Sequence, residues 1–216
     1  MKWFSTLAEV FWPRSLKCLC CETLSDGEAL CPTCRKALLS MRLAPEDAGD
    51  ECIRSLFRHD GVAKELVLLL KLECVADAAS VLAQHMVEEI QRMNVPPSTV
   101  LTWVTMPERR RKERGIDHGR MLCEEIGRLS GLPVRQLLHR TGWTHTQRGL
   151  GREARLRNLN GTFACMEELS SPVLLIDDVM TTGATASTCA AVLMASGAPC
   201  VYVLTATKAM LISRNN

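Results

Sequence analysis

Hydrophobic residues recur along the chain with two different periods, and the two periods alternate. Residues 62–72 and 78–93 carry apolar side chains every three or four positions, which is typical of helices that pack through one face. Four aliphatic residues in a row at 173–176 suit a strand that is buried on both faces. Further strands are predicted at 100–105, 133–138 and 200–205, and further helices at 119–130 and 185–195. Strands that alternate with helices in this way predict an α/β fold with a parallel sheet.

The pattern divides the chain into three predicted units. Residues 1–40 hold a short amphipathic helix and a cysteine-rich stretch, and residues 41–60 are expected to be a linker or a hairpin. Residues 61–216 form the main α/β domain, in which residues 139–163 lack both periods and are expected to be a loop. No apolar run reaches the roughly 18 residues that a membrane-spanning helix needs.

Charge and cysteine are unevenly spread along a chain of otherwise ordinary composition. The net charge of +2 conceals a basic section at 109–157, which holds thirteen Lys or Arg and five Asp or Glu, a local charge of +8. This section indicates an anionic partner, either a polyphosphate or a nucleic acid, although a solvated Arg-rich surface has the same composition. Six of the eleven cysteines are scattered among apolar neighbours. A disulfide scaffold is therefore not expected, and the reducing cytosol is the predicted compartment.

Two Cys-x-x-Cys pairs lie close together near the N-terminus. Cys18 and Cys21 are followed after nine residues by Cys31 and Cys34, a spacing that lets four thiolates surround a tetrahedral Zn²⁺. So short a segment would depend on the metal for its folding, and four sulfur ligands leave no open position for catalysis. A structural zinc site is therefore predicted. Cys20 is an alternative ligand that could replace Cys18 or Cys21.

Two carboxylates, Asp177 and Asp178, follow the aliphatic run at the point where the strand is expected to end. Ligands of open α/β sheets bind beyond the carboxyl ends of the strands. The next seven residues lead into a helix whose N-terminus should present free N–H groups to a phosphate: Val179, Met180, Thr181, Thr182, Gly183, Ala184 and Thr185. The carboxylates suit the vicinal hydroxyls of a sugar, so a ribose 5-phosphate unit is the predicted ligand. The alternative is an ordinary acidic turn with a helix capped by Thr181 or Thr182.

This run resembles the signature of type I phosphoribosyltransferases, in which such a segment holds phosphoribosyl pyrophosphate (PRPP). Further segments resemble the ComF family, which is named for its part in bacterial DNA uptake by natural transformation. They are Leu70-Lys71 at a helix end, the basic run Arg109 to Arg114 before Gly115, Arg140-Thr141, Gln147, Arg155, Asn158 and Gly161-Thr162-Phe163. The resemblance spans residues 8–207. It implies a type I phosphoribosyltransferase-like parallel sheet flanked by helices, with a small N-terminal zinc-binding unit that has four cysteine ligands.

Two departures from the family pattern lie near the place expected for pyrophosphate. Glu108 stands where a Pro-rich turn is usual, and Ile116-Asp117-His118 stands where Phe-Asn-Gln is common. The added carboxylates would weaken the attraction for pyrophosphate. They therefore bear on turnover more than on the fold.

The resemblance also implies the ligand, the partners and the residues that contact them. PRPP would bind with Mg²⁺, and Asp177 and Asp178 would act as the catalytic pair that holds the ribose or its hydrated metal. Ligand contacts are expected from residues 179–185 together with Arg109, Arg110, Lys112 and Arg114. Single-stranded DNA and a DNA-uptake helicase are the expected partners. The candidate DNA contacts are Arg110, Arg111, Arg148, Arg152, Arg155 and Arg157, with Trp103 and Trp143 as the nearest stacking platforms.

Three functions stay open from the sequence. The first is a PRPP-binding protein that serves DNA uptake. The second is an active phosphoribosyltransferase that forms a nucleotide from PRPP and an unidentified base, for which no base-recognising segment is evident. The third is a zinc-ribbon interaction module with a vestigial phosphate site.

Overall fold

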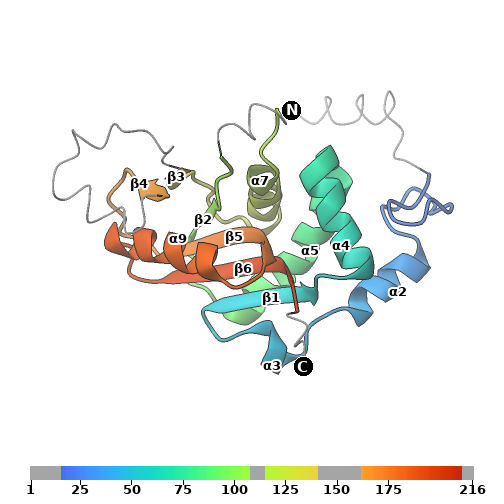
Figure 1. Ribbon diagram of the computed structural model, residues 1–216, viewed down its shortest axis with the longest axis horizontal. Coiled ribbons are helices and arrows are strands. Elements are labelled where there is room, and N and C mark those ends of the chain that lie inside the picture. The colour runs from blue at the N-terminus through green and yellow to red at the C-terminus, as the bar shows by residue number, and fades with distance from the viewer. Residues whose placement is uncertain (1–15, 108–114, 141–161, 211–216) are drawn as a thin grey trace, which may run out of the picture.

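A parallel sheet forms the centre of the protein in a computed structural model that describes residues 16–107, 115–140 and 162–210 (Figure 1). Its strands are β1 (Ile53–Arg58), β2 (Val100–Trp103), β5 (Val173–Met180) and β6 (Val201–Lys208), in the order β1-β6-β5-β2. All three neighbouring pairs run parallel. A separate antiparallel pair consists of β3 (Leu138–Arg140) and β4 (Phe163–Cys165).

Helices cover both faces of the sheet. One face is covered by α4 (Gly61–Leu68), α5 (Ala76–Met93) and α7 (His118–Ser130), and the other by α9 (Ala184–Ala195) (Figure 1). Two more helices, α2 (Pro32–Ser40) and α3 (Pro45–Ala48), precede β1. The predicted α/β class, a parallel sheet flanked by helices, is therefore confirmed.

The aliphatic run of β5 supplies both apolar layers of the core. Leu174 and Ile176 belong to the buried cluster under α4, α5 and α7, whereas Val173 and Leu175 belong to the cluster under α9 and the β3–β4 pair. Successive residues of a strand point to opposite faces, so burial on both sides requires apolar side chains at every position. The run is therefore continuous because β5 is an interior strand.

Two predicted segments differ from the structure. Residues 41–60 are not a linker or hairpin, because they contain α3 and the edge strand β1, which pairs with β6. Polar residues interrupt this strand, and only its middle, Ser55 to Phe57, is buried. The sequence therefore does not show the regular alternation of apolar and polar residues that identifies a strand. The strand expected at 133–138 is reduced to a single bridge between Val134 and Leu101, and regular pairing begins only at Leu138.

The helix predicted at 62–72 changes its winding before it ends. After Leu68 it continues as a π-helical turn, η1 (Leu69–Glu73), which ends at Cys74 in the left-handed conformation with φ of 54°. Single π turns are rare and occur often at functional sites, because the extra residue displaces a side chain from the regular helical stripe. Lys71 lies within this turn and reaches the carboxyl end of β5, as described below.

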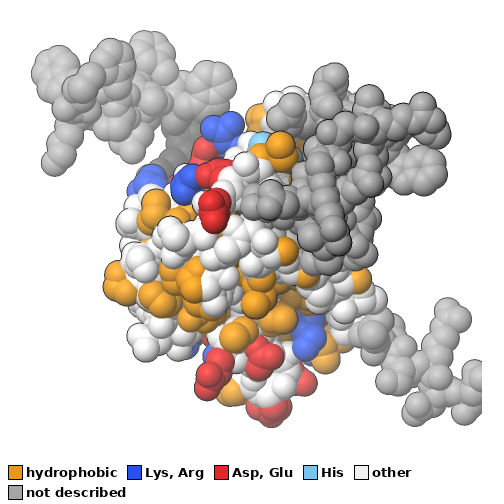
Figure 2. All heavy atoms as spheres, turned by 90° about the vertical axis from the view of Figure 1, so that its left-hand side faces the viewer, with side chains coloured by type: hydrophobic (Ala, Val, Ile, Leu, Met, Phe, Trp, Pro, Cys, Tyr) orange, Lys and Arg blue, Asp and Glu red, His pale blue; other side chains and the backbone are white. Residues whose placement is uncertain are grey.

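The face that carries α9 and β4 has an apolar centre. Figure 2 shows hydrophobic side chains gathered across its middle, with acidic groups above and below. Met194 on α9 and Met166 just after β4 are both exposed. Within the described part of the chain, no helix combines the length and the apolar character that crossing a bilayer requires.

Candidate functional site

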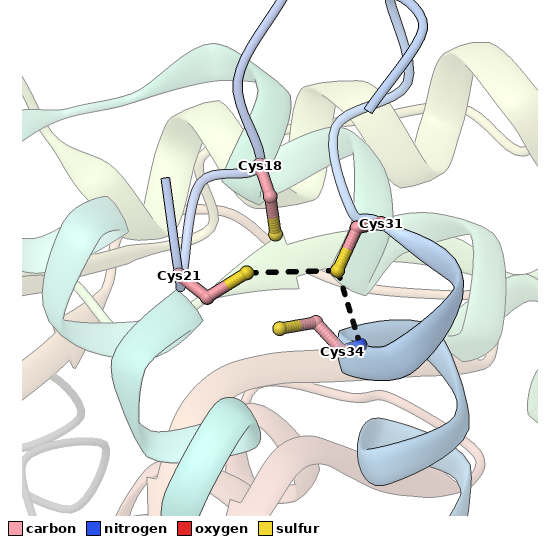
Figure 3. Close-up of side chains that lie close together, drawn as sticks. All are labelled: Cys18, Cys21, Cys31 and Cys34. Carbon is pink, nitrogen blue, oxygen red and sulfur yellow. Dashed lines mark hydrogen bonds between the residues drawn. The ribbon is translucent and has the colours of Figure 1, made fainter. Parts of the chain in front are cut away.

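The four predicted zinc ligands form one cluster. The sulfur atoms of Cys18, Cys21, Cys31 and Cys34 all lie within 4.8 Å of one another (Figure 3). The Sγ atoms of Cys21 and Cys31 are 3.6 Å apart. Four sulfurs at about 2.3 Å from a tetrahedral Zn²⁺ would be separated by about 3.8 Å, so the cluster fits this ion closely.

Local backbone structure brings the two cysteine pairs together. Cys31 caps the N-terminus of α2, where its Sγ accepts a hydrogen bond from the N–H of Cys34 at 3.5 Å. Cys18 donates its backbone N–H to the carbonyl of Thr23 at 2.7 Å, which closes the first knuckle. Among the described residues Cys20 is not part of the cluster, and burial, followed by the charge of Cys18, raises its pKa to about 12. The alternative that Cys20 replaces a ligand is therefore not favoured.

The second site lies at the carboxyl end of β5, where this strand is longer than its neighbour. The last pair between β2 and β5 joins Trp103 to Ile176, whereas β5 stays paired with β6 as far as Met180. Asp177 and Asp178 therefore lie beyond the end of β2 but still within β5. The prediction that they follow the strand is corrected, because β5 runs from Val173 to Met180, and Asp178 is only 5% exposed.

The two carboxylates point to opposite faces of the sheet. Asp178 contacts Lys71 and His118 on the side of α4 and α7. Asp177 lies on the side of α9, where its charge, after burial, contributes to raising the pKa of Cys189 to about 12. This separation follows from the twofold period of a strand, because adjacent residues cannot share a face.

Asp178 is held by two basic side chains. Its Oδ1 lies 2.8 Å from Nζ of Lys71, and its Oδ2 lies 3.0 Å from Nε2 of His118. Burial by itself would raise the pKa of Asp178, but His118 and Lys71 outweigh burial and hold this pKa below its ordinary value. Asp178 is therefore ionised and internally paired.

Asp177 has a different electrostatic environment. Burial, and then the charge of Asp178, raise the pKa of Asp177 to about 7. Its Oδ1 accepts the backbone N–H of Asp178 at 3.0 Å. A carboxyl group that exchanges its proton near neutral pH can either accept or donate a hydrogen bond to a ligand hydroxyl. The two acids of the motif therefore have different chemistry.

The loop after β5 has the geometry of an open helix N-terminus. Gly183 is the N-cap residue of α9, with φ of 79°, and it has no side chain to cap the first N–H groups. The hydroxyl of Thr182 accepts the N–H of Ala184 at the long distance of 3.4 Å. Thr181, Thr182 and Thr185 are exposed, whereas Met180 is buried and faces away from solvent. The loop therefore offers N–H and hydroxyl donors to an anion.

Several residues at this site were not predicted to be functional. Lys71 and His118 were noted only as part of the family resemblance and of its departures. Thr207 of β6 also contacts the end of β5, because its hydroxyl donates to the carbonyl of Asp178 at 3.0 Å, and Nδ1 of His59 lies 2.9 Å from the same hydroxyl. A polar residue at a helix end or strand end is the only sequence signal that could have identified them.

The predicted basic contacts lie outside the described residues. This applies to Arg109, Arg110, Arg111, Lys112, Arg114, Arg148, Arg152, Arg155 and Arg157, and to Trp143. Trp103 is described and is 4% exposed, and its Nε1 donates to Asp117 at 3.1 Å. Trp103 is therefore a core residue, and its predicted role as a stacking platform is wrong.

A cavity of about 600 Å³ lies between α5 and α7, beside this site. It is lined by two ion pairs, Arg120 with Glu124 and Arg128 with Glu125, and by two further acids, Asp77 and Asp117. Because the acids outnumber the arginines, the cavity lacks the surplus of positive charge that an anionic ligand needs. The loop at 181–185 is the better anion site.

Comparison with known proteins gives distant relatives. No family model matches the chain. Two proteins named DNA utilization protein YhgH, from Salmonella typhi and Salmonella typhimurium, are each 26% identical to it over 200 and 202 residues, which is 86% of this chain and 86% of theirs.

Solved structures show similarity at low sequence identity. Glutamine PRPP amidotransferase from B. subtilis is 14% identical with a TM-score of 0.44, over 64% of this chain and 30% of the enzyme. Adenine phosphoribosyltransferase from Leishmania tarentolae is 16% identical with a TM-score of 0.38, over 65% of this chain and 74% of the enzyme. The chain thus spans less than a third of the amidotransferase.

Proposed function

We propose that this chain is a ComF-like protein of the phosphoribosyltransferase type that binds a ribose 5-phosphate ligand, with PRPP and Mg²⁺ as the best fit. The observation that carries the proposal is the uncapped N-terminus of α9 beside Asp177. The N–H groups of residues 184–186 would hold the phosphate, and the hydroxyls of Thr181, Thr182 and Thr185 would add donors. Asp177 would contact a sugar hydroxyl, and Mg²⁺ would neutralise the pyrophosphate of PRPP.

The proposed biological role is in the use of DNA. The two relatives carry that role in their name, DNA utilization protein, and they match most of the chain. A basic section at 109–157 is suited to a polyanion, so single-stranded DNA is the proposed partner, with a DNA-uptake helicase as a protein partner. None of the eleven cysteines is in a disulfide, which supports the reducing cytosol as the compartment and zinc as the ion of the four-cysteine cluster.

Calorimetry with ribose 5-phosphate and with PRPP, each with and without Mg²⁺, tests the ligand. The informative variant is Thr185→Glu, because an acid in the first turn is favourable for the helix but competes with a bound phosphate. Ser187→Glu is the matched control, since it adds the same charge to an exposed position of the same helix on a different side. We expect Thr185→Glu to lose binding while Ser187→Glu retains it. Equal binding by the two variants would contradict the proposal.

A further inference from the structure

A second group of charged side chains lies beside the edge strand β1, which β6 separates from β5. Arg54 lies on β1, Arg92 in the last turn of α5, and Arg42 between α2 and α3. All three contact Glu89 of α5, which is 6% exposed. Because α5 covers one face of the sheet and α9 covers the other, this group is separate from the loop at 181–185.

Glu89 holds the three guanidinium groups around it. Its Oε2 accepts hydrogen bonds from Nη2 of Arg42 at 3.0 Å and from Nη1 of Arg92 at 2.9 Å. Its Oε1 lies 3.0 Å from Nε of Arg54, an ion pair without hydrogen-bond geometry, so this buried Nε has no hydrogen-bond partner among the described residues. Burial by itself would raise the pKa of Glu89, but the three arginines hold this pKa below its ordinary value. Glu89 is therefore ionised at neutral pH.

One carboxylate does not balance three guanidinium groups. The three arginines and Glu89 line a cavity of about 270 Å³, and Glu89 is the only acid among the described residues of its lining, which leaves a surplus of two positive charges. Glu88 lies 3.4 Å from Arg42, but its side chain is 50% exposed, so water screens its charge. Glu46 and Asp47 are exposed on α3 and do not line the cavity. Gathering like charges costs free energy, and a bound anion would offset that cost.

We propose that this cavity binds a phosphate group, carried by a nucleotide or by a nucleic acid backbone. The planar guanidinium group can donate two parallel hydrogen bonds to a phosphate. Arg92 uses only Nη1 to contact Glu89, and its side chain is 55% exposed, so its other N–H groups can reach a ligand. An apolar wall, against which a sugar or a base can pack, is formed by Leu43, Pro45 and Leu56. This inference does not depend on the proposed function.

Titration of nitrogen-15-labelled protein with inorganic phosphate at low salt tests the site directly. The Nε–H resonances of Arg42, Arg54 and Arg92 should shift until they saturate, whereas the resonance of Arg128 should stay in place. Arg128 is the matched internal control, because like Arg92 it is exposed, lies in the last turn of its helix and pairs with the glutamate three residues before it. Equal shifts of Arg92 and Arg128 would reveal a general ionic effect, and these or no shifts at all would overturn the proposal.

Substitutions at the same two positions measure the affinity through the Arg54 resonance. We expect Arg92→Ala to weaken phosphate about tenfold, the effect of losing a hydrogen bond from a charged donor, and Arg128→Ala to leave the affinity unchanged. Both side chains are more than half exposed, so both variants should fold. An Arg92→Ala protein that binds phosphate as tightly as the wild type would contradict the proposal.

Two further arms separate this site from the other phosphate site and identify the source of the phosphate. Thr185→Glu should leave the shifts of Arg54 and Arg92 in place, because it changes only the loop at 181–185. Shifts that vanish in this variant would assign the phosphate to the loop and overturn the inference. Deoxythymidine monophosphate and a short oligothymidylate are then compared at the same resonances. Tighter binding of the mononucleotide would identify a free nucleotide as the ligand, and tighter binding of the oligomer would identify a nucleic acid.

Discussion

Replacing Asp177 with Asn should stabilise the folded protein at neutral and alkaline pH, and the gain should vanish in acid. Burial, and then the charge of Asp178, raise the pKa of Asp177 from 3.8 to about 7. Between these two values the unfolded chain has lost the proton that the folded protein still binds. Folding stability therefore falls as the pH rises through this window, and the full penalty is present above about pH 7. An Asn side chain has no proton to lose and escapes the penalty.

The size of the gain follows from the same pKa difference. Each tenfold difference in proton affinity corresponds to about 1.4 kcal/mol, so the shift from 3.8 to about 7 gives an upper limit of about 4 kcal/mol. Solvent reaches part of Asp177 and screens its charge, so we expect about 2 kcal/mol. The amide oxygen of Asn can still accept the N–H of Asp178, which Asp177 now accepts at 3.0 Å.

Urea unfolding of wild type and Asp177→Asn across the range from about pH 4 to about pH 8 measures the effect. With a slope of about 2 kcal/mol per molar urea, the midpoint of the variant should rise by about 1 M at pH 8 and by much less at pH 4. Exposed Asp47→Asn is the control for a change of one charge. A difference that is the same at every pH would refute the reasoning. The variant should also bind ribose 5-phosphate more weakly, because a functional group in an unfavourable environment trades stability for activity.

Three further predictions concern the zinc cluster, the ion pair of Asp178 and the basic section. The purified protein should carry about one Zn²⁺ per chain, and Cys31→Ser should lose the metal and lower the melting temperature while Cys20→Ser keeps both; a metal-free protein of equal stability would exclude the zinc site. Lys71→Met should destabilise the protein by about 2–3 kcal/mol at pH 7 in urea unfolding, because it leaves buried Asp178 with one partner fewer. The low pKa of Asp178 contributes stability only above the pKa of an unfolded Asp, so this loss should shrink as the pH falls towards 3, and a loss that persists there would contradict the ion pair. Charge reversal at Arg110 and Arg155 should weaken single-stranded DNA binding regardless of sequence and flatten its salt dependence by about 0.7 in slope per lost contact; binding that ignores salt would argue against the basic section as the interface.

The elements that the sequence predicts well are those in which hydrophobic residues recur with one clear period. The helix α5 carries buried Leu82, Met86 and Ile90 at helical spacing, and the prediction at 78–93 differs from the structure by two residues. The edge strand β1 was missed because its polar positions interrupt the alternation, and its pairing with β6 joins segments that are about 150 residues apart. Non-local pairing of this kind leaves no periodic signal in the strand itself.

The candidate site shows the same limit at the level of single residues. The four zinc ligands could be predicted because their spacing along the chain already places the thiolates around one ion. Lys71 could not, because its position depends on the π-helical turn at Leu69–Glu73, and a helix of regular winding would carry this side chain at a different angle. His118 depends on the capping of α7 by Asp117, whose carboxylate was expected only to weaken pyrophosphate binding.

Two adjacent acids in a motif are easily interpreted as a pair, and the length of β5 decides whether that is correct. The last residue of β2, Trp103, pairs with Ile176 of β5. Had β5 also ended there, Asp177 and Asp178 would lie in a turn and both could face one ligand. Because β6 keeps pairing with β5 through Met180, the backbone stays extended and the two side chains must alternate. Asp177 is thereby left on the side of the phosphate loop with a raised pKa, and Asp178 is directed to Lys71 and His118. The extra length of one strand thus assigns different chemistry to two identical residues.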